Sequence, residues 1–149
     1  MKIIFCILFF VLSFTNILSS NEKNYYLILK NNEVNVRYGP GFDYPIKYIY
    51  KKKNLPIKVI DKKENFRRII DFKNNSGWIH YTQLKNGKAI ILLEDQILFN
   101  KPTKYSKPLI KIAKGRLLLI EKCSNNWCKA KTENYLGWLI NKNVWGNIE

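Results

Sequence analysis

The chain has 149 residues, of which 26 are Lys or Arg and 11 are Asp or Glu, so its formal net charge is +15 at pH 7. This length allows one medium-sized domain or two very small ones. With one histidine and three cysteines, the chain offers few of the ligands that a metal centre needs, and we expect neither a metal nor another cofactor.

Residues 1–20 have the pattern of a secretory signal peptide. Lys2 precedes an apolar run from Ile3 to Phe14, and small and polar residues follow up to Ser20. The run is short for a membrane span of about 20 residues, so we expect cleavage and export to the periplasm or cell envelope. An uncleaved membrane anchor is the alternative. Removal of residues 1–20 takes away one lysine and lowers the net charge from +15 to +14.

The basic residues are spread along the whole chain, and their longest run is Lys51–Lys53. One interpretation is attraction to an anionic surface, such as membrane head groups or cell-wall polymers. The other is a composition rich in Lys, Asn and Ile that has no functional meaning. Export argues against nucleic acid as a partner.

After residue 20, the sequence predicts β-strands throughout. Short runs of β-branched and aromatic residues are separated, about every 8–12 residues, by Asn, Gly, Pro, Asp and Lys. In chain order, the expected strands are 25–29, 35–37, 46–50, 56–60, 66–71 and 77–80, and then 89–93, 96–99, 109–113, 116–120, 127–130 and 137–140.

The second series of strands repeats the first at an offset of about 60 residues. Gly77-Trp78 matches Gly137-Trp138, and segment 55–60 matches segment 116–121. A repeat of this length is a whole small domain. We therefore expect an all-β protein with two tandem five-stranded barrels, because a closed barrel lets so few residues bury a core and leaves few free sheet edges.

The expected organisation places a lead-in strand in 21–32, the first barrel in 33–84, a linker or strand in 85–95 and the second barrel in 96–149. The linker is short, and its segment 89–93 is too apolar for a solvated tether. We expect this segment to be a strand that packs between the two barrels.

The segment from Val34 to Ile46 contains Asn-Val-Arg-Tyr-Gly-Pro-Gly and resembles the opening of a bacterial SH3-like (SH3b) domain. An apolar strand, an aromatic residue at the start of a hairpin, a Gly-Trp pair and a short helical turn follow in the family's order. The resemblance covers nearly all of residues 33–146, although the second repeat departs from the opening motif at Phe99-Asn100-Lys101. The tandem form resembles small exported proteins of Gram-negative bacteria.

The glycines suggest particular turns and close contacts. We expect Gly39 and Gly41 to adopt positive φ angles around Pro40. We expect Gly77 and Gly137 to permit close backbone approach where a strand bends. Each following tryptophan, Trp78 or Trp138, would then cover one end of a small core.

Cys123 and Cys128 are expected to form a disulfide, because they are the two cysteines left after export into an oxidising compartment. If Trp127 faces the core together with Leu118 and Ile120, strand alternation turns both cysteines outward. A tight turn would place them opposite each other on neighbouring strands.

Catalysis is not expected. His80 has no evident nucleophile as a partner, the acidic residues are scattered singly, and no phosphate-binding or metal-binding spacing occurs. The resemblance implies a non-catalytic binding protein whose ligand lies in a groove between the long first loop and the distal hairpin. On this chain, that groove would consist of Arg37, Tyr38, Phe42, Tyr44, Trp78 and Tyr81.

Two alternatives apply to these groove residues. The aromatic ones could be core residues of a very small barrel, and Arg37 could hold its loop internally. The partners that the resemblance implies are peptides, other proteins or peptidoglycan. There are two alternatives for function. One is a protein–protein adaptor. The other is a protein held electrostatically at an anionic membrane through Lys51–Lys53 and Arg67-Arg68.

Overall fold

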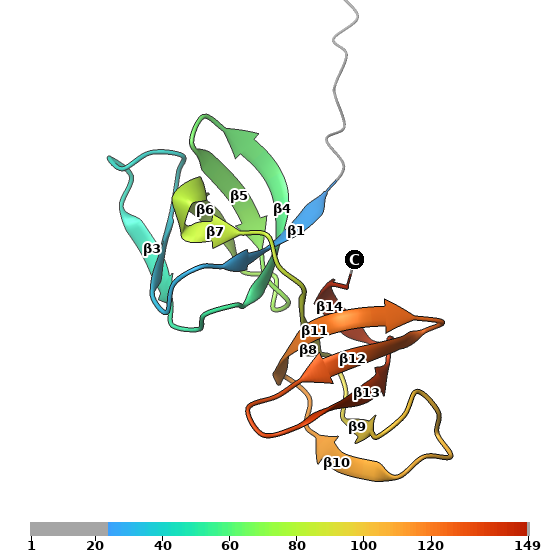
Figure 1. Cartoon of the computed structure of the whole chain (residues 1–149). Helices are drawn as coiled ribbons and strands as arrows, with labels where there is room; N and C mark the ends of the chain where they lie inside the picture. Colours follow the sequence, from blue (N-terminus) through green and yellow to red (C-terminus); the bar gives the residue numbers. More distant parts are fainter. Residues whose placement is uncertain (1–23, 149) are drawn as a thin grey trace, which may run out of the picture.

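The computed structural model describes residues 24–148, so the expected signal peptide lies outside the described residues. The chain forms two small antiparallel β-barrels joined by one short connection (Figure 1). No helix among residues 24–148 is long and apolar enough to cross a membrane.

The first barrel is built from seven strands and one short helix. Its sheet has the order β3-β2-β6-β5-β4-β1-β7. The elements are β1 (Tyr25–Leu29), β2 (Val34–Arg37), β3 (Ile46–Tyr50), β4 (Pro56–Lys63), β5 (Phe66–Ile70), β6 (Ser76–His80), the 3₁₀-helix η1 (Tyr81–Gln83) and β7 (Leu84–Lys85).

The second barrel repeats this topology with the order β10-β9-β13-β12-β11-β8-β14. The all-β, twice-repeated architecture predicted from the sequence is confirmed, and the short strands β7 and β14 complete seven strands in each sheet. Of the two short helical turns that the family's order implies after the Gly-Trp pairs, the first is present as η1, whereas the second, at 141–144, is not helical. The strands are β8 (Ala89–Leu92), β9 (Gln96–Phe99), β10 (Pro108–Ile112), β11 (Leu117–Ser124), β12 (Trp127–Lys131), β13 (Leu136–Ile140) and β14 (Val144–Asn147).

The two Gly-Trp pairs are arranged differently from the expectation that each tryptophan caps a core. Gly77 is buried and faces inward, where an added Cβ would lie 2.3 Å from a side-chain carbon of Val36. Trp78 therefore faces outward, because successive residues of a strand point to opposite faces. Gly137 is likewise buried, and an added Cβ there would lie 2.7 Å from the Phe99 carbonyl oxygen. The predicted close approach at the two glycines is confirmed. Gly77 lies against strand β2, and Gly137 lies against strand β9.

The cysteine pair lies on the opposite side of strand β12 from the one predicted. Cys123 and Cys128 are joined by a disulfide, but Cys128 is fully buried in the second core and Trp127 faces outward. The register shifts between Ile120 and Lys122, so β11 contains a bulge. One extra residue inverts the alternation of the strand beyond it, which the sequence argument assumed to be unbroken. Ile120 and Cys123, three residues apart, therefore contact the same core.

Strand β8 lies between the two barrels and is buried along its whole length. Ile90 and Leu92 belong to the core of the second barrel, whereas Ile91 belongs to the core of the first. The strand expected over 89–93 is thus present and packs on both sides. The two cores meet across a single strand.

Trp145 on β14 closes this junction. Its ring meets the Tyr26 ring edge-on at 5.5 Å between centroids, and its Nε1 donates a hydrogen bond to the Pro56 carbonyl oxygen at 3.3 Å. The next residue, Gly146, has φ = 136°, and an added Cβ there would lie 2.1 Å from the Ala89 oxygen. Glycine lets β14 approach β8 closely and brings Trp145 onto the first barrel.

A buried carboxylate fastens the β5–β6 loop to strand β3. Asp71, only 2% exposed, accepts hydrogen bonds from the backbone N–H groups of Lys73 and Asn75 and from the Tyr50 hydroxyl at 3.0 Å. Tyr50 in turn lies 3.3 Å from the hydroxyl of Tyr48. Burial, followed by these neighbours, raises the pKa of Tyr50 far above its ordinary value, so this hydroxyl stays protonated at neutral pH and donates to Asp71.

Replacement of Trp145 by alanine tests the junction. Loss of the ring contact with Tyr26 and of the hydrogen bond to Pro56 is expected to lower the free energy of unfolding by about 2–4 kcal/mol. Proteolytic cleavage within 85–95 should become faster. The matched control, Trp138→Ala on the outer face of β13, should cost about 1 kcal/mol. Equal losses for the two variants in chemical denaturation would contradict a special role of Trp145.

The double variant Cys123→Ala/Cys128→Ala tests the disulfide. The bridge closes a loop with a sequence separation of 5. Chain entropy predicts a loss of about 2 kcal/mol in unfolding free energy, and chemical reduction of the wild type should give a similar loss. Denaturation with and without reductant measures both effects, and a wild-type stability unaffected by reductant would argue against the bridge.

Candidate functional site

The β2–β3 loop of the first barrel is held in place by Arg37, the last residue of β2. Its Nη1 donates to the carbonyl oxygens of Phe42 at 3.2 Å and Tyr44 at 2.7 Å. Its guanidinium also lies over the Phe42 ring, 5.4 Å from the centroid. Of the two roles left open for Arg37, the internal one is therefore observed. The arginine fixes the shape of a loop that carries three exposed aromatic residues.

The turn around Pro40 is compact for a reason other than the one predicted. Neither Gly39 nor Gly41 has a positive φ angle, so the expectation of left-handed glycines here is wrong. The Tyr44 ring lies instead directly against Gly39, where an added Cβ would be 2.3 Å from the ring. The glycine is needed for space, because the ring packs on the backbone of the turn.

An aromatic ridge continues from this loop across the outer face of the barrel. The Phe42 ring lies 5.1 Å from the His80 ring and 5.3 Å from the Phe66 ring, and the His80 ring lies 5.0 Å from that of Tyr81. Phe66 and His80 are register partners on β5 and β6. We call Phe42, Phe66, His80 and Tyr81 the aromatic ridge.

The ridge has a buried base and an exposed crest. Phe66 is 5% exposed, whereas Phe42 is 66% and Tyr81 47% exposed. Phe66 is not part of the first barrel's main core cluster. It is covered instead by Phe42 and His80. Stacked rings with an exposed apolar crest can bind an extended ligand through contact area, and polar groups around the crest can orient it.

Cations border the ridge on two sides. Arg37 lies over Phe42 at one end, and the Arg67 guanidinium lies 6.0 Å from the Tyr81 centroid at the other. Nδ1 of His80 is 2.7 Å from the Thr82 hydroxyl oxygen, which fixes the orientation of the imidazole. These groups provide hydrogen-bond donors suited to carbonyl or carboxylate oxygens of a ligand.

The remaining predicted groove residues lie near the ridge without joining it. Tyr38 is 62% exposed, and the Lys47 ammonium lies 5.6 Å from its ring centroid. Trp78 is partly exposed on the outer face of β6 and is paired in register with Arg37 and Arg68. The structure thus links Arg37, Phe42 and Tyr44 by direct contacts and reaches Tyr81 through His80.

Sequence reasoning missed Phe66 and His80 as members of this surface. Phe66 enters the sequence argument only as the aromatic residue at the start of a hairpin, and His80 only as a candidate catalytic group. A signal was present in the alternation of β6. With Gly77 and Ile79 facing inward, Trp78 and His80 must face outward, and the cross-strand partner of His80 shares its face.

The second barrel carries a different outer surface. Phe99 stands at the position of Arg37, and its ring meets the Trp127 ring edge-on at 5.8 Å. The Lys122 ammonium lies 5.7 Å from the centroid of Trp138. No group of three or more His, Cys, Asp or Glu side chains is placed to hold a metal ion anywhere in residues 24–148.

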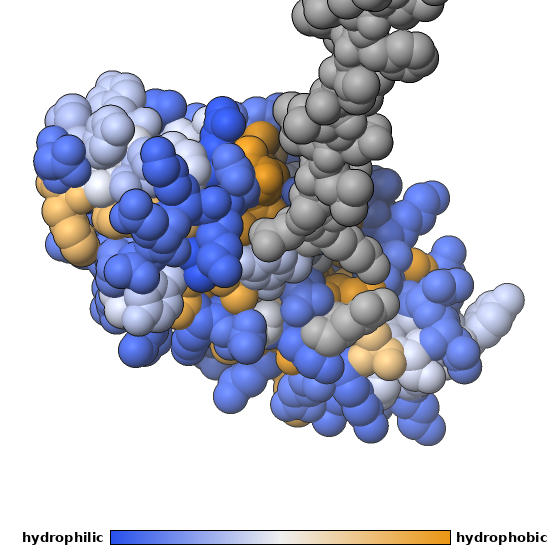
Figure 2. Space-filling view, turned by 90° about the horizontal axis from the view of Figure 1, so that it is seen from above, coloured by the Kyte–Doolittle hydropathy of each residue, from blue (hydrophilic) through white to orange (hydrophobic). Residues whose placement is uncertain are grey.

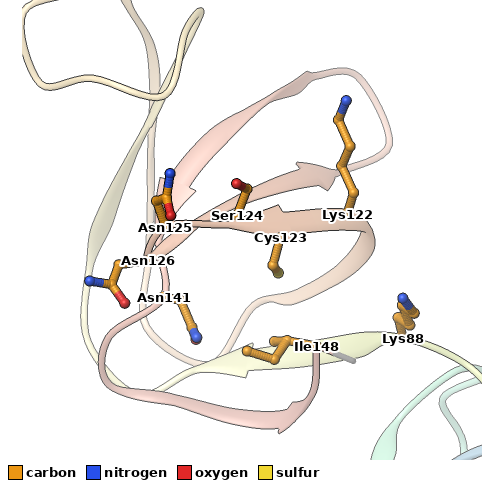
Figure 3. A pocket seen from close by; sticks show the side chains of 8 residues that line it. All are labelled: Lys88, Lys122, Cys123, Ser124, Asn125, Asn126, Asn141 and Ile148. Carbon is orange, nitrogen blue, oxygen red and sulfur yellow. The ribbon is translucent and has the colours of Figure 1, made fainter.

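A hollow of about 360 Å³ lies beside the disulfide of the second barrel. In Figure 3 the Cys123 side chain points toward Ile148 across this hollow, and Asn126 and Asn141 stand at one end. The hollow contains no member of the predicted groove. Its lining consists of Lys88, Lys122, Cys123, Ser124, Asn125, Asn126, Asn141 and Ile148.

The variant Arg37→Met tests the loop geometry. Methionine keeps part of the side-chain length and removes both hydrogen bonds to the loop carbonyls, so the loop should open and Phe42 should leave His80. We expect a loss of about 1–2 kcal/mol in unfolding free energy and faster hydrogen exchange in residues 38–45. Lys52→Met, which removes an exposed cation outside residues 38–45, is the control. Unchanged exchange in Arg37→Met would contradict the tether.

Comparison with known proteins places these features in a family. The family model of the bacterial SH3 domain matches residues 30–86 and 94–146, one match on each barrel. No curated protein matches the chain. Six chains of known structure match.

Two of the matching structures are NlpC2 and NlpC1 of Trichomonas vaginalis, at 10% and 11% identity and a TM-score of 0.39 each. The matches cover 86% and 87% of this chain, which spans about half the length of those proteins, 50% and 48%. The assignment rests on the two family matches, which together cover most of the chain. The protein belongs to the bacterial SH3 domain family and contains two such domains in tandem.

Proposed function

We propose that this protein is an exported, non-catalytic binding protein of the cell envelope, and that the first barrel binds an extended peptide, such as the peptide part of peptidoglycan, along the aromatic ridge. The observation that carries the proposal is the exposed crest of Phe42 and Tyr81. The Phe42 ring packs on Phe66, and Arg37 holds the loop that carries Phe42, so the crest is ordered before a ligand binds. A surface that is already ordered loses little conformational entropy when a ligand binds.

The chemistry of the ridge favours a peptide with acidic or carbonyl groups. Rings along the crest provide flat apolar contact area. Arg67 beside Tyr81 and the remaining N–H groups of Arg37 beside Phe42 provide charged donors at the two ends. Extended peptides bind such aromatic surfaces with their backbone carbonyls accessible, and peptidoglycan stems also carry carboxylates.

Export is part of the proposal and is supported by two features. The sequence of residues 1–20 has the order of a signal peptide. The disulfide between Cys123 and Cys128 suits an oxidising compartment such as the periplasm. The non-catalytic role is supported by His80, whose ring packs between Phe42 and Tyr81 and whose Nδ1 is engaged by Thr82.

A protein–protein adaptor is the second candidate function. It is favoured by the junction at β8 and Trp145, which joins the two barrels through one continuous apolar contact. Two barrels held in this way can present one composite surface to a partner protein. Pull-down from envelope extracts distinguishes the two functions, because an adaptor would retain a defined protein in the absence of wall material.

The double variant Phe42→Ala/Tyr81→Ala tests the aromatic ridge. Sedimentation with purified sacculi should show at least about tenfold weaker binding, because exposed anchoring aromatics contribute most of the energy of such contacts. Wild-type binding should persist at about 0.3 M salt, where bare charge attraction is screened. Tyr135→Ala is the control, because Tyr135 on the second barrel is exposed to nearly the same extent as Tyr81, 41% against 47%. Equal retention of the double variant and wild type on sacculi, with identical pull-down partners, would remove the ridge as the ligand site.

A further inference from the structure

The two barrels carry chemically different loops at the same place in the fold. The β2–β3 loop of the first barrel contains Phe42, and the corresponding β9–β10 loop of the second barrel contains Lys104. We call residues 100–107 the basic loop. Its lysines Lys101, Lys104 and Lys107 are all exposed, and the Tyr105 side chain is 100% exposed.

The positive charge of this region is not balanced by nearby acids. Residues 96–120 contain six Lys or Arg residues and no Asp or Glu. The acid nearest to the basic loop in sequence, Asp95, pairs with Lys111 at 3.1 Å and accepts a hydrogen bond from the backbone N–H of Lys114. Among the described residues, none of the ion pairs involves a lysine of the basic loop. The ammonium groups of Lys101, Lys104 and Lys107 therefore create a positive electrostatic potential around the basic loop.

The basic loop is held in one shape by its own hydrogen bonds. The Ser106 hydroxyl contacts the Lys101 N–H at 3.2 Å and the Thr103 carbonyl at 2.9 Å. The Asn100 N–H donates to the Lys107 carbonyl at 3.0 Å. Thr103 Oγ1 accepts from the Tyr105 N–H at 3.3 Å. Presentation of the lysines and the tyrosine thus requires little further ordering of the backbone.

The loop lies at the free end of the molecule. Strand β10 is the last strand of its sheet. In Figure 1 the connection between β9 and β10 projects from the second barrel on the side away from β8, β14 and the first barrel. Figure 2 shows hydrophilic residues over most of the face that it displays, with smaller apolar patches. An exposed ring at the tip of a basic loop is thus free to meet an extended surface.

We propose that the basic loop docks the protein onto an anionic lipid bilayer, with Tyr105 at the level of the head groups and Lys101, Lys104 and Lys107 facing the phosphates. Tyrosine is favoured at membrane interfaces because its ring is apolar and its hydroxyl is polar. Lysines close to an anionic leaflet each add to the attraction. This inference is independent of the aromatic ridge, and it uses a surface other than Lys51–Lys53.

The projecting tyrosine distinguishes a bilayer from a soluble polyanion. A polyanion would bind the lysines by charge alone and would leave the Tyr105 ring in water. A bilayer offers an apolar layer beneath its phosphates, so the ring gains contact there that a soluble polymer cannot supply. The docking strength should therefore depend on both the lysines and the ring.

The experiment measures sedimentation of the chain from residue 21 onward, which retains every described strand, with two kinds of vesicle. One is phosphatidylcholine alone, and the other is an equimolar mixture of phosphatidylcholine and phosphatidylglycerol. At about 0.1 M salt, binding is expected only to the mixed vesicles. The triple variant Lys101→Gln/Lys104→Gln/Lys107→Gln should bind them roughly a hundredfold more weakly. Tyr105→Ser should bind several-fold more weakly, and Tyr105→Trp should restore binding.

The matched control is Lys51→Gln/Lys52→Gln/Lys53→Gln, which removes the same charge from the first barrel. It should change vesicle binding by less than about threefold at this salt concentration, because these lysines follow β3 on the first barrel and the basic loop is on the second (Figure 1). An equal loss in this control would overturn the proposal, since net charge alone would explain the attraction. The proposal would also be overturned if Tyr105→Ser bound the mixed vesicles as tightly as wild type and soluble polyglutamate bound the protein with the same affinity as the vesicles. That result would indicate a surface that binds any polyanion. The basic-loop variants should still sediment with sacculi, which separates this test from that of the ridge.

Discussion

The rest of the structure depends on the burial of strand β8 from both sides. A barrel of fewer than about 60 residues is close to the size limit for a stable core. Ile91 extends the core of the first barrel, while Ile90 and Leu92 complete that of the second. The first barrel therefore does not close its core with its own residues alone, because Ile91 comes from a strand of the second barrel. This shared strand, with Trp145 against Pro56, makes the pair one structural body and fixes the relation between the two outer surfaces.

The same topology supports two different surfaces because the inward positions of β6 and β13 are occupied by glycine and an aliphatic residue, Gly77 and Ile79 or Gly137 and Leu139. On the crossing strands, Gly77 and Gly137 face inward and leave room for β2 and β9. The aromatic rings on β6 and β13 must then lie on the outer face of the barrel. In the first barrel, His80 joins Phe66 of β5 and the loop residue Phe42 in the aromatic ridge, and in the second barrel Phe99 and Trp127 form a smaller pair.

The two barrels differ in chemistry at the same loop of the fold, which is 38–45 in the first and 100–107 in the second. The first barrel's loop packs around Arg37 and Gly39, which support Tyr44 and orient Phe42. The second barrel lacks both residues, and Ser106 with Thr103 holds its loop through side-chain hydrogen bonds instead. Two different local solutions thus produce two ordered loops. One presents a ring crest suited to a peptide, and the other presents ammonium groups suited to an anionic surface.

Much of the fold could be predicted because its determinants are local. Alternating β-branched residues and turn residues located nearly every strand, and the repeated Gly-Trp pairs revealed the duplication. The apolar segment 89–93 indicated a strand between the barrels for the same reason, since a solvated tether would not contain four consecutive large apolar residues. Side-chain direction was less predictable. The bulge after Ile120 moved Cys128 into the core and Trp127 out of it, and bulges have only a weak signature in a single sequence.

The candidate site, like the fold, could be predicted only in part. The sequence by itself determined the all-β class, the tandem repeat, the cysteine pair and the presence of an aromatic first loop, because each depends on residue type and spacing. Only the tertiary structure decided that Arg37 holds that loop and that Phe66 and His80 continue it across β5 and β6. Such contacts depend on strand pairing, on register and on which face of the sheet each residue occupies. These are set by the packing of distant segments against one another rather than by neighbours along the chain.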